Sequence, residues 1–181
     1  SANSVSLWYD QARRLQNANG PWGAATYYYT SVGDRSYEIV TPSGGATTTK
    51  VQNYPATSNR LANVTTNGTL TRSFTHDAAG NITVDVKGGD TYTTTYNVRN
   101  RPVSVTRSGT ASQTSTYAYN ALEQMVTRVT TAPGGPAGTV HYIYDTDGHL
   151  IAEADGATGA TLREYIWLAS NDNTPVDLPL G

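Results

Sequence analysis

Apolar and polar residues alternate with a period of two along much of the chain. Ile82, Val84 and Val86 are separated by Thr and Asp, and Val103 and Val105 are separated by Ser. Because the side chains of a β-strand point alternately to its two faces, this pattern predicts strands with one apolar and one polar face. Such strands are typical of an antiparallel sheet that buries one face and leaves the other in water.

One short pattern recurs along the chain, and its best-preserved copy is Tyr144-Asp145-Thr146-Asp147-Gly148-His149-Leu150. Asp accepts hydrogen bonds from the backbone two residues on, and Gly adopts a positive φ, so this stretch predicts strand, turn, strand. Seven copies lie 20 to 25 residues apart. Their first residues, called anchors below, are Tyr9, Tyr29, Tyr54, His76, Tyr96, Tyr119 and Tyr144.

A second turn signal lies about midway between successive anchors. It consists of hairpin dipeptides such as Asn67-Gly68, Gly88-Gly89, Ser108-Gly109 and Asp155-Gly156. The spacing therefore accommodates two strands of about five or six residues and two reversals per copy. The sequence predicts an all-β fold, an antiparallel β-sheet of repeated hairpins, in a single region over residues 1–181.

The composition supports this fold and excludes several classes of partner. The chain has 13 Tyr and 3 Trp, which supply apolar area that the scarce Leu, Ile and Phe do not. Charged residues make up 14% and the net charge is −2, so no nucleic acid and no anionic membrane is expected as a partner. There is no Cys, no apolar run long enough for membrane insertion, and no signal peptide at residues 1–4.

The copies resemble the YD repeat of the Rhs family, which reads Tyr-Asp, two or three variable residues, Gly, Asn or Arg, then an apolar residue. The copies anchored at 9, 76 and 144 match it best. The matching positions are Asp10, Asp77, Gly80, Asp145 and Gly148, and Gly33 is kept in a weaker copy. The segment 163–168, with Thr174-Pro175-Val176 after it, is similar to the segment that follows the last repeats in bacterial Rhs proteins. The resemblance covers residues 7–176.

The resemblance implies a curved or spiralling sheet that closes into a hollow shell, which in the toxins of the family encloses a C-terminal effector. The implied partners are the rest of the same shell protein or an encapsulated effector, and the implied location is exported, secreted or cell-surface. Residues 163–181 would lead towards a core domain that is missing here. That domain cleaves the chain with a D-P-x-G-type motif, and the sequence has no Asp-Pro. We therefore expect a non-enzymatic chain.

The anchors have two interpretations. Rings stacked across strands, each hydroxyl with a partner, are favoured over an exposed row that binds sugars. The alternative function is a carbohydrate-binding repeat module, with Trp8, Trp22 and Trp167 as glycan-stacking candidates. An exposed ring surface and open sheet edges also predict self-association.

Three sets of residues are candidates for other chemistry, and each has a simpler interpretation. The Asp of each copy is expected to cap its turn, because Asn replaces it at positions 97 and 120. His76, His141 and His149 lack the close spacing of a zinc motif. Glu153, Asp155 and Glu164 form an acidic cluster that a hydrolase would need to place across a cleft. We predict no catalytic residue, no metal and no cofactor.

Overall fold

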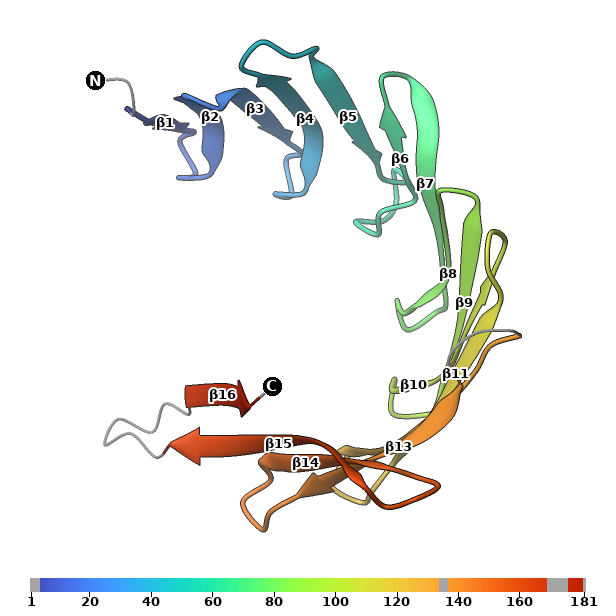
Figure 1. The fold of residues 1–181 in the computed structure, drawn as a ribbon. Helices are drawn as coiled ribbons and strands as arrows, with labels where there is room; N and C mark the ends of the chain where they lie inside the picture. Colours follow the sequence, from blue (N-terminus) through green and yellow to red (C-terminus); the bar gives the residue numbers. More distant parts are fainter. Residues whose placement is uncertain (1–3, 134–136, 169–175, 181) are drawn as a thin grey trace. The chain divides into compact units, whose positions relative to one another are not determined.

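The computed structural model describes residues 4–133, 137–168 and 176–180, with side chains described up to Trp167 (Figure 1). The predicted all-β fold of antiparallel hairpins is confirmed, because the described residues form strands and turns and no helix. Within this described part there is consequently no helix with the length and apolarity needed to span a membrane.

The chain forms two compact units, residues 1–89 and residues 90–181. The strands of the first unit are β1 (Ser6–Tyr9), β2 (Leu15–Gly20), β3 (Gly23–Tyr29), β4 (Arg35–Pro42), β5 (Thr48–Asn53), β6 (Asn63–Thr66), β7 (Thr69–His76) and β8 (Ile82–Lys87). The strands of the second are β9 (Asp90–Tyr96), β10 (Pro102–Ser108), β11 (Gln113–Tyr119), β12 (Met125–Thr131), β13 (Gly138–Tyr144), β14 (Leu150–Asp155), β15 (Thr161–Leu168) and β16 (Val176–Leu180).

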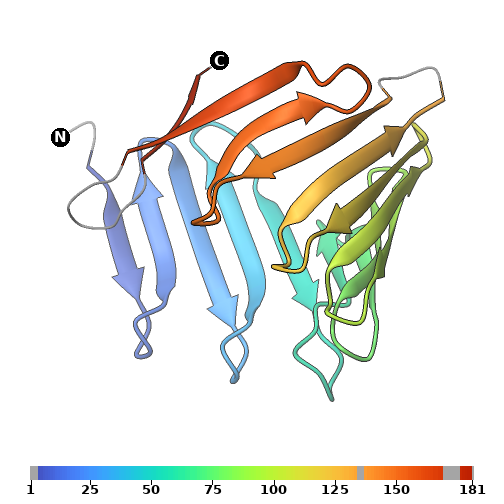
Figure 2. The same cartoon turned by 90° about the horizontal axis from the view of Figure 1, so that it is seen from below.

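Within each unit every strand pairs antiparallel with the next strand of the chain. Successive reversals therefore alternate between the two ends of the strands. The turns that follow the anchors all fall at one end, and the midway hairpins fall at the other. Figure 2 shows the first three anchored turns of the first unit beside one another at the lower ends of β1 to β6.

The register of the strands separates two faces of each unit, because residues directly opposite one another across a strand pair share a face. In the first unit Tyr27, Glu38 and Lys50 form one such row across β3, β4 and β5. In the second unit Tyr142, Glu153 and Arg163 form another across β13, β14 and β15. We call the face that carries these rows and the anchors the tyrosine face.

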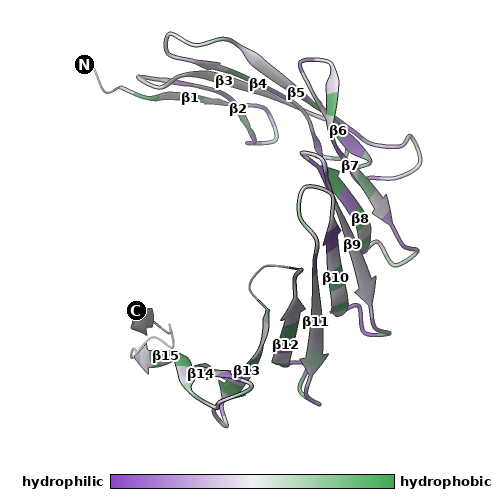
Figure 3. Ribbon diagram, turned by 45° about the vertical axis from the view of Figure 1, so that its right-hand side comes forward, coloured by the Kyte–Doolittle hydropathy of each residue, from purple (hydrophilic) through white to green (hydrophobic). Residues whose placement is uncertain are grey.

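The prediction that one face of the sheet is buried is wrong for the described residues. Ala18, Ala25 and Ala154 are the only apolar residues that are buried there, whereas Ile82 is 40% and Val86 37% exposed. A sheet buries its apolar face only against a second layer, and within either unit the described residues form a single layer. Figure 3 shows apolar and polar residues interspersed along the strands of that layer.

Candidate functional site: the tyrosine face

The anchored turns satisfy their own backbone groups. The Asp10 carboxylate accepts the backbone N–H groups of Ala12 and Arg14, both at 2.9 Å. The backbone N–H of Arg14 is the largest cause that holds the pKa of Asp10 below its ordinary value. The same bonds form at Asp77, Asn97, Asn120 and Asp145. Since Asn accepts them as well as Asp does, the turn uses the side-chain oxygen and not the acidity.

The fourth residue after the anchor has a positive φ in six of the seven copies. It is Gly in three of them, with φ between 91° and 98° at Gly33, Gly80 and Gly148. In the other three it is Arg13, Asn100 or Glu123, with φ between 60° and 66°. A left-handed conformation costs a residue with a Cβ about 1 kcal/mol, so the turn geometry is imposed by the hydrogen bonds around it.

Four of the anchors are linked to the copy before them through their hydroxyl groups. Tyr29 donates to the backbone oxygen of Leu15 at 2.8 Å, and Tyr144 donates to that of Met125 at 3.0 Å. Tyr54 and Tyr119 make the same bond to Arg35 and Pro102, at 3.2 and 2.8 Å. In every case the acceptor is the sixth residue after the previous anchor. Burial is the largest cause that raises the pKa of the hydroxyl at positions 54, 119 and 144.

The expected stacking of successive anchor rings is not seen among the described residues. The ring pairs found there are Tyr28 with Tyr37, Phe74 with His76, and His149 with Trp167. Successive anchors lie two strands apart, about 9 to 10 Å, whereas stacked rings need centroids within about 7 Å. The long phenol bridges that gap with its hydroxyl, and another side chain fills the space between the rings.

In the copies anchored at Tyr9 and Tyr144 that side chain is the fifth residue after the anchor. The Arg14 guanidinium lies 4.4 Å from the centroid of the Tyr29 ring, and its Nε donates to Asp10 Oδ2 at 2.7 Å. In the last of the seven copies His149 takes the same place. Its Nδ1 lies 3.0 Å from Asp145 Oδ2, and its ring lies 4.7 Å from the Trp167 ring at an angle of 31°.

Trp167 is the anchor of an eighth copy, which sequence reasoning missed. Its indole Nε1 donates to the backbone oxygen of Leu150 at 2.7 Å, as an anchor Tyr hydroxyl would. Leu150 is the sixth residue after Tyr144, and Trp167 follows Tyr144 by 23 residues, within the range of the other spacings. The signal was present in the spacing, but Trp in place of Tyr concealed it.

The three Trp candidates for glycan stacking do not form one surface. Trp167 uses its N–H and one ring face within the repeat. Trp8 is exposed, and it lies opposite Asn17 on the face away from its neighbour, the anchor Tyr9. Trp22 is exposed in the hairpin between β2 and β3. The sequence hypothesis that these rings act together as a sugar platform therefore receives no support from their positions.

Asp145, Asp147 and His149 place ligand atoms within 4.8 Å of one another. Both Asp145 oxygens and His149 Nδ1 already take part in hydrogen bonds of the turn. The arrangement is therefore that of the other anchored turns. His141 lies elsewhere, with Nδ1 3.2 Å from Thr127 Oγ1, and His76 packs beside Phe74.

The acidic cluster near the end of the chain is divided between two faces. Glu153 lies on the tyrosine face and accepts the Tyr165 hydroxyl at 2.5 Å. Glu164 is opposite Ala152 on the other face, so these two carboxylates cannot flank one bond. Asp155 caps the following hairpin through the backbone N–H groups of Ala157 and Thr158.

Asp90 is a buried carboxylate that directly follows the predicted Gly88-Gly89 hairpin signal. The residue is 7% exposed. Its carboxylate accepts the Arg107 guanidinium at 2.6 Å and the backbone N–H and hydroxyl of Thr110 at 2.8 and 2.6 Å. These bonds, that of Arg107 above all, lower the pKa of Asp90 to about 2.

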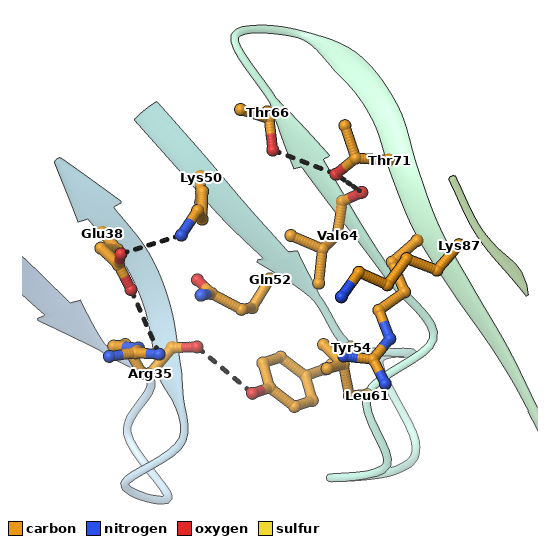
Figure 4. A pocket seen from close by; sticks show the side chains of 11 residues that line it. Arg35, Glu38, Lys50, Gln52, Tyr54, Leu61, Val64, Thr66, Thr71 and Lys87 are labelled. Atoms are coloured by element: carbon orange, nitrogen blue, oxygen red, sulfur yellow. Dashed lines mark hydrogen bonds and ion pairs between the residues drawn. The ribbon is translucent and has the colours of Figure 1, made fainter. Parts of the chain in front are cut away.

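A pocket of about 430 Å³ opens on the tyrosine face of the first unit (Figure 4). The short strand β6 contributes small side chains, Val64 and Thr66, between longer ones of β5 and β7. Lys50, Gln52, Tyr54, Arg72 and Lys87 are the longer side chains that line it, together with Arg35 and Glu38 from β4. The small residues therefore create a depression in the sheet surface.

The link between copies predicts how a change at His149 behaves. The free energy of unfolding of the His149→Arg variant should stay within about 1 kcal/mol of the parent value. Arg14 shows that an Arg fits this position, between the Asp of the turn and the next anchor ring. The Asp145→Ala variant should unfold at a lower temperature than the parent chain, because the backbone N–H groups of residues 147 and 149 lose their acceptor. Thermal unfolding followed by circular dichroism measures both. A larger loss in the Arg variant than in the Ala variant would contradict the assignment.

No family model matches the chain, and no curated protein matches its sequence. The fold is similar to that of a chain in the crystal structure of TcdB2-TccC3-Cdc42, with a TM-score of 0.55 and 12% identity over 94% of this chain and 12% of that one. A chain of the Photorhabdus luminescens Tc holotoxin pore matches with a TM-score of 0.48 and 11% identity, over 98% of this chain and 14% of that one. At this identity the likeness establishes the fold alone.

Proposed function

We propose that the chain is a non-enzymatic structural segment of a β-shell of the Rhs type, part of a toxin or cell-surface protein that encapsulates or presents a C-terminal effector. The observation that carries the proposal is the bond that four Tyr anchors and Trp167 each make to the copy before them, which commits these polar groups to holding the sheet together. The turn carboxylates and the Arg or His beside them are likewise bonded within the repeat. The fold likeness to a TcdB2-TccC3 structure supports the same function.

Under this proposal the natural partner of the sheet is the rest of the same shell protein or the enclosed effector. The protein is exported, secreted or displayed at the cell surface. Repeat units bury their cores between neighbours, so a layer with two open faces is stable in a larger assembly. Strand β1 pairs only with β2 among the described residues, so its second edge is open to a further strand.

The isolated chain should self-associate, and light scattering over a range of low concentrations tests this. A Leu7→Lys variant distinguishes the open edge from the open face, because Leu7 is 49% exposed on β1 and a charge on an edge strand opposes strand pairing. Leu70→Lys is the matched control, since Leu70 is 61% exposed on the interior strand β7. We expect association to fall more in the Leu7 variant. A monodisperse monomer with no bound partner would contradict the proposal.

A further inference from the structure

We propose that the pocket on the tyrosine face of the first unit is a binding site for an acidic sugar. The proposal goes beyond the structural function, since a shell segment requires no ligand. It rests on four properties of the pocket: its size, its positive charge, an unsatisfied amide, and a fixed aromatic ring. A volume of about 430 Å³ lies within the range of small-molecule sites, which is about 300 to 1,000 Å³.

The charge of the pocket selects an anion. Four cationic residues line it, and Glu38 is the only acidic one. Glu38 is shared, because it lies 3.2 Å from both Arg35 and Lys50. Arg72 is held by Asp85, which does not line the pocket, through bonds of 2.8 and 2.6 Å.

Lys87 supplies the charge that remains for a ligand. It is exposed, and it forms no ion pair with a described residue. Lys87 lies directly opposite Arg72, whose side chain already neutralises Asp85. An ammonium group without a carboxylate partner, at the rim of a pocket with excess positive charge, is suited to a single carboxylate of a ligand.

Gln52 supplies a polar contact that a simple anion would leave unused. Its amide oxygen is covered and has no hydrogen-bond donor among the described residues. An unbonded carbonyl oxygen is unfavourable, and rotation of the amide exchanges the positions of its oxygen and nitrogen. A ligand hydroxyl could then donate to the oxygen at its new position, and this contact favours a polyhydroxylated acid over a bare carboxylate.

Tyr54 and its neighbours supply the apolar surface that a sugar ring needs on its less polar side. The Tyr54 ring is fixed by the bond from its hydroxyl to the Arg35 backbone oxygen at 3.2 Å. Leu61 and Val64 line the same pocket and add to its apolar surface. Ring, amide and ammonium together describe a six-membered sugar with a carboxylate.

The second unit offers an internal comparison. Its pocket of about 570 Å³ is lined by one cation, Arg128, and one carboxylate, Asp155. It has no excess of positive charge, and we expect it to bind no acidic sugar. Arg128 therefore serves as a control position on the same face of the other unit.

Saturation-transfer NMR on the whole chain tests the proposal, since the method tolerates self-association. The probes are methyl β-D-glucuronide, the neutral methyl β-D-glucoside, and acetate. We expect the glucuronide to bind at least about tenfold more tightly than either of the others, because only it uses both the ammonium and the amide. Equal binding of the neutral sugar, or of acetate, would overturn the proposal, as would no binding of the glucuronide.

Matched variants assign the contacts. Lys87→Gln should weaken glucuronide binding about tenfold, and Gln52→Leu should reduce it to the level of acetate. Arg128→Gln removes a charge from the other pocket and should leave binding unchanged. An equal loss of glucuronide binding in all three variants would overturn the site.

A glucuronate-terminated disaccharide extends the comparison. If it binds as tightly as the methyl glucuronide, the single sugar acid is sufficient, and if it binds more tightly, the ligand is a glycan chain. Self-association is measured separately, so failure here leaves the structural proposal standing.

Discussion

The Asp90→Asn variant is expected to unfold several degrees below the parent chain at pH 7. Asp90 is almost fully covered and accepts three hydrogen bonds, two from Thr110 and one from Arg107. The substitution removes the charge that Arg107 pairs with, and loss of one member of a largely buried ion pair is among the most destabilising changes a domain experiences. Thermal unfolding followed by circular dichroism measures the difference.

The same pair predicts how the difference depends on pH. The pKa of Asp90 falls from 3.8 to about 2 on folding, chiefly through the bond from Arg107. A carboxyl with a lowered pKa in the folded state contributes stability above its ordinary pKa and loses it as the pH falls through the folded value. The gap between the parent and Asp90→Asn should therefore be full at pH 7 and at pH 5, and should close between about pH 4 and 2.

Asp147→Asn is the control for both measurements. Asp147 is exposed on a turn, and the change removes the same charge. Its free energy of unfolding should stay within about 0.5 kcal/mol of the parent value, as is usual for substitutions at the surface. If Asp90→Asn behaved like this control, or if its deficit persisted at pH 2, the ion pair would not be a source of stability.

Truncation of an anchor is the second large effect. Tyr144→Ala should cost about 3 kcal/mol, because it removes a half-buried ring and the bond to the Met125 backbone oxygen. Tyr144→Phe keeps the ring and loses only the hydroxyl, so it should cost about 1 kcal/mol. The difference between the two variants separates packing from the hydrogen bond, and chemical denaturation measures both.

Tyr28→Phe is the matched control for the hydroxyl. Tyr28 is exposed, is not an anchor, and lies edge-on to Tyr37 at 6.1 Å between ring centroids. Removal of its hydroxyl should have little effect on stability. A loss in Tyr144→Phe no larger than in Tyr28→Phe would mean that the link between copies is a packing contact alone.

The strands and turns followed from local chemistry and were therefore predictable. Alternating residues specify a strand, and an Asx residue followed by Gly specifies a reversal, wherever they occur. The same local chemistry predicts that Asp10 and Asp145 cap their turns, and their carboxylates accept backbone N–H groups of those turns. Such features depend on residues within about five positions of one another, which a single sequence displays directly.

The features that were missed depend on partners distant in the chain. The acceptor of an anchor hydroxyl is a backbone oxygen, and every residue carries one, so no side chain reveals it. Trp167 was not predicted as an anchor, because the bond that makes it one joins it to the backbone oxygen of Leu150, 17 residues earlier. Asp90 and Arg107 are likewise 17 residues apart. The expectation of a buried face was wrong for the described residues. Alternating apolar and polar residues show only which face of a strand is more apolar, whereas burial of that face requires a second layer of structure packed against it.

The bonds from these anchors to backbone oxygens also bear on how far the sequence of such a chain can vary. The acceptors among the described copies are Leu, Arg, Pro, Met and Leu, which have no chemistry in common. The anchor, one turn residue and a tolerated positive φ are all that the geometry requires of each copy, so most positions are free to diverge. A sheet held in this way can share its fold with a chain of 12% identity. The fold of such a chain can therefore be recognised from its hydrogen-bond geometry where the residues themselves have little in common.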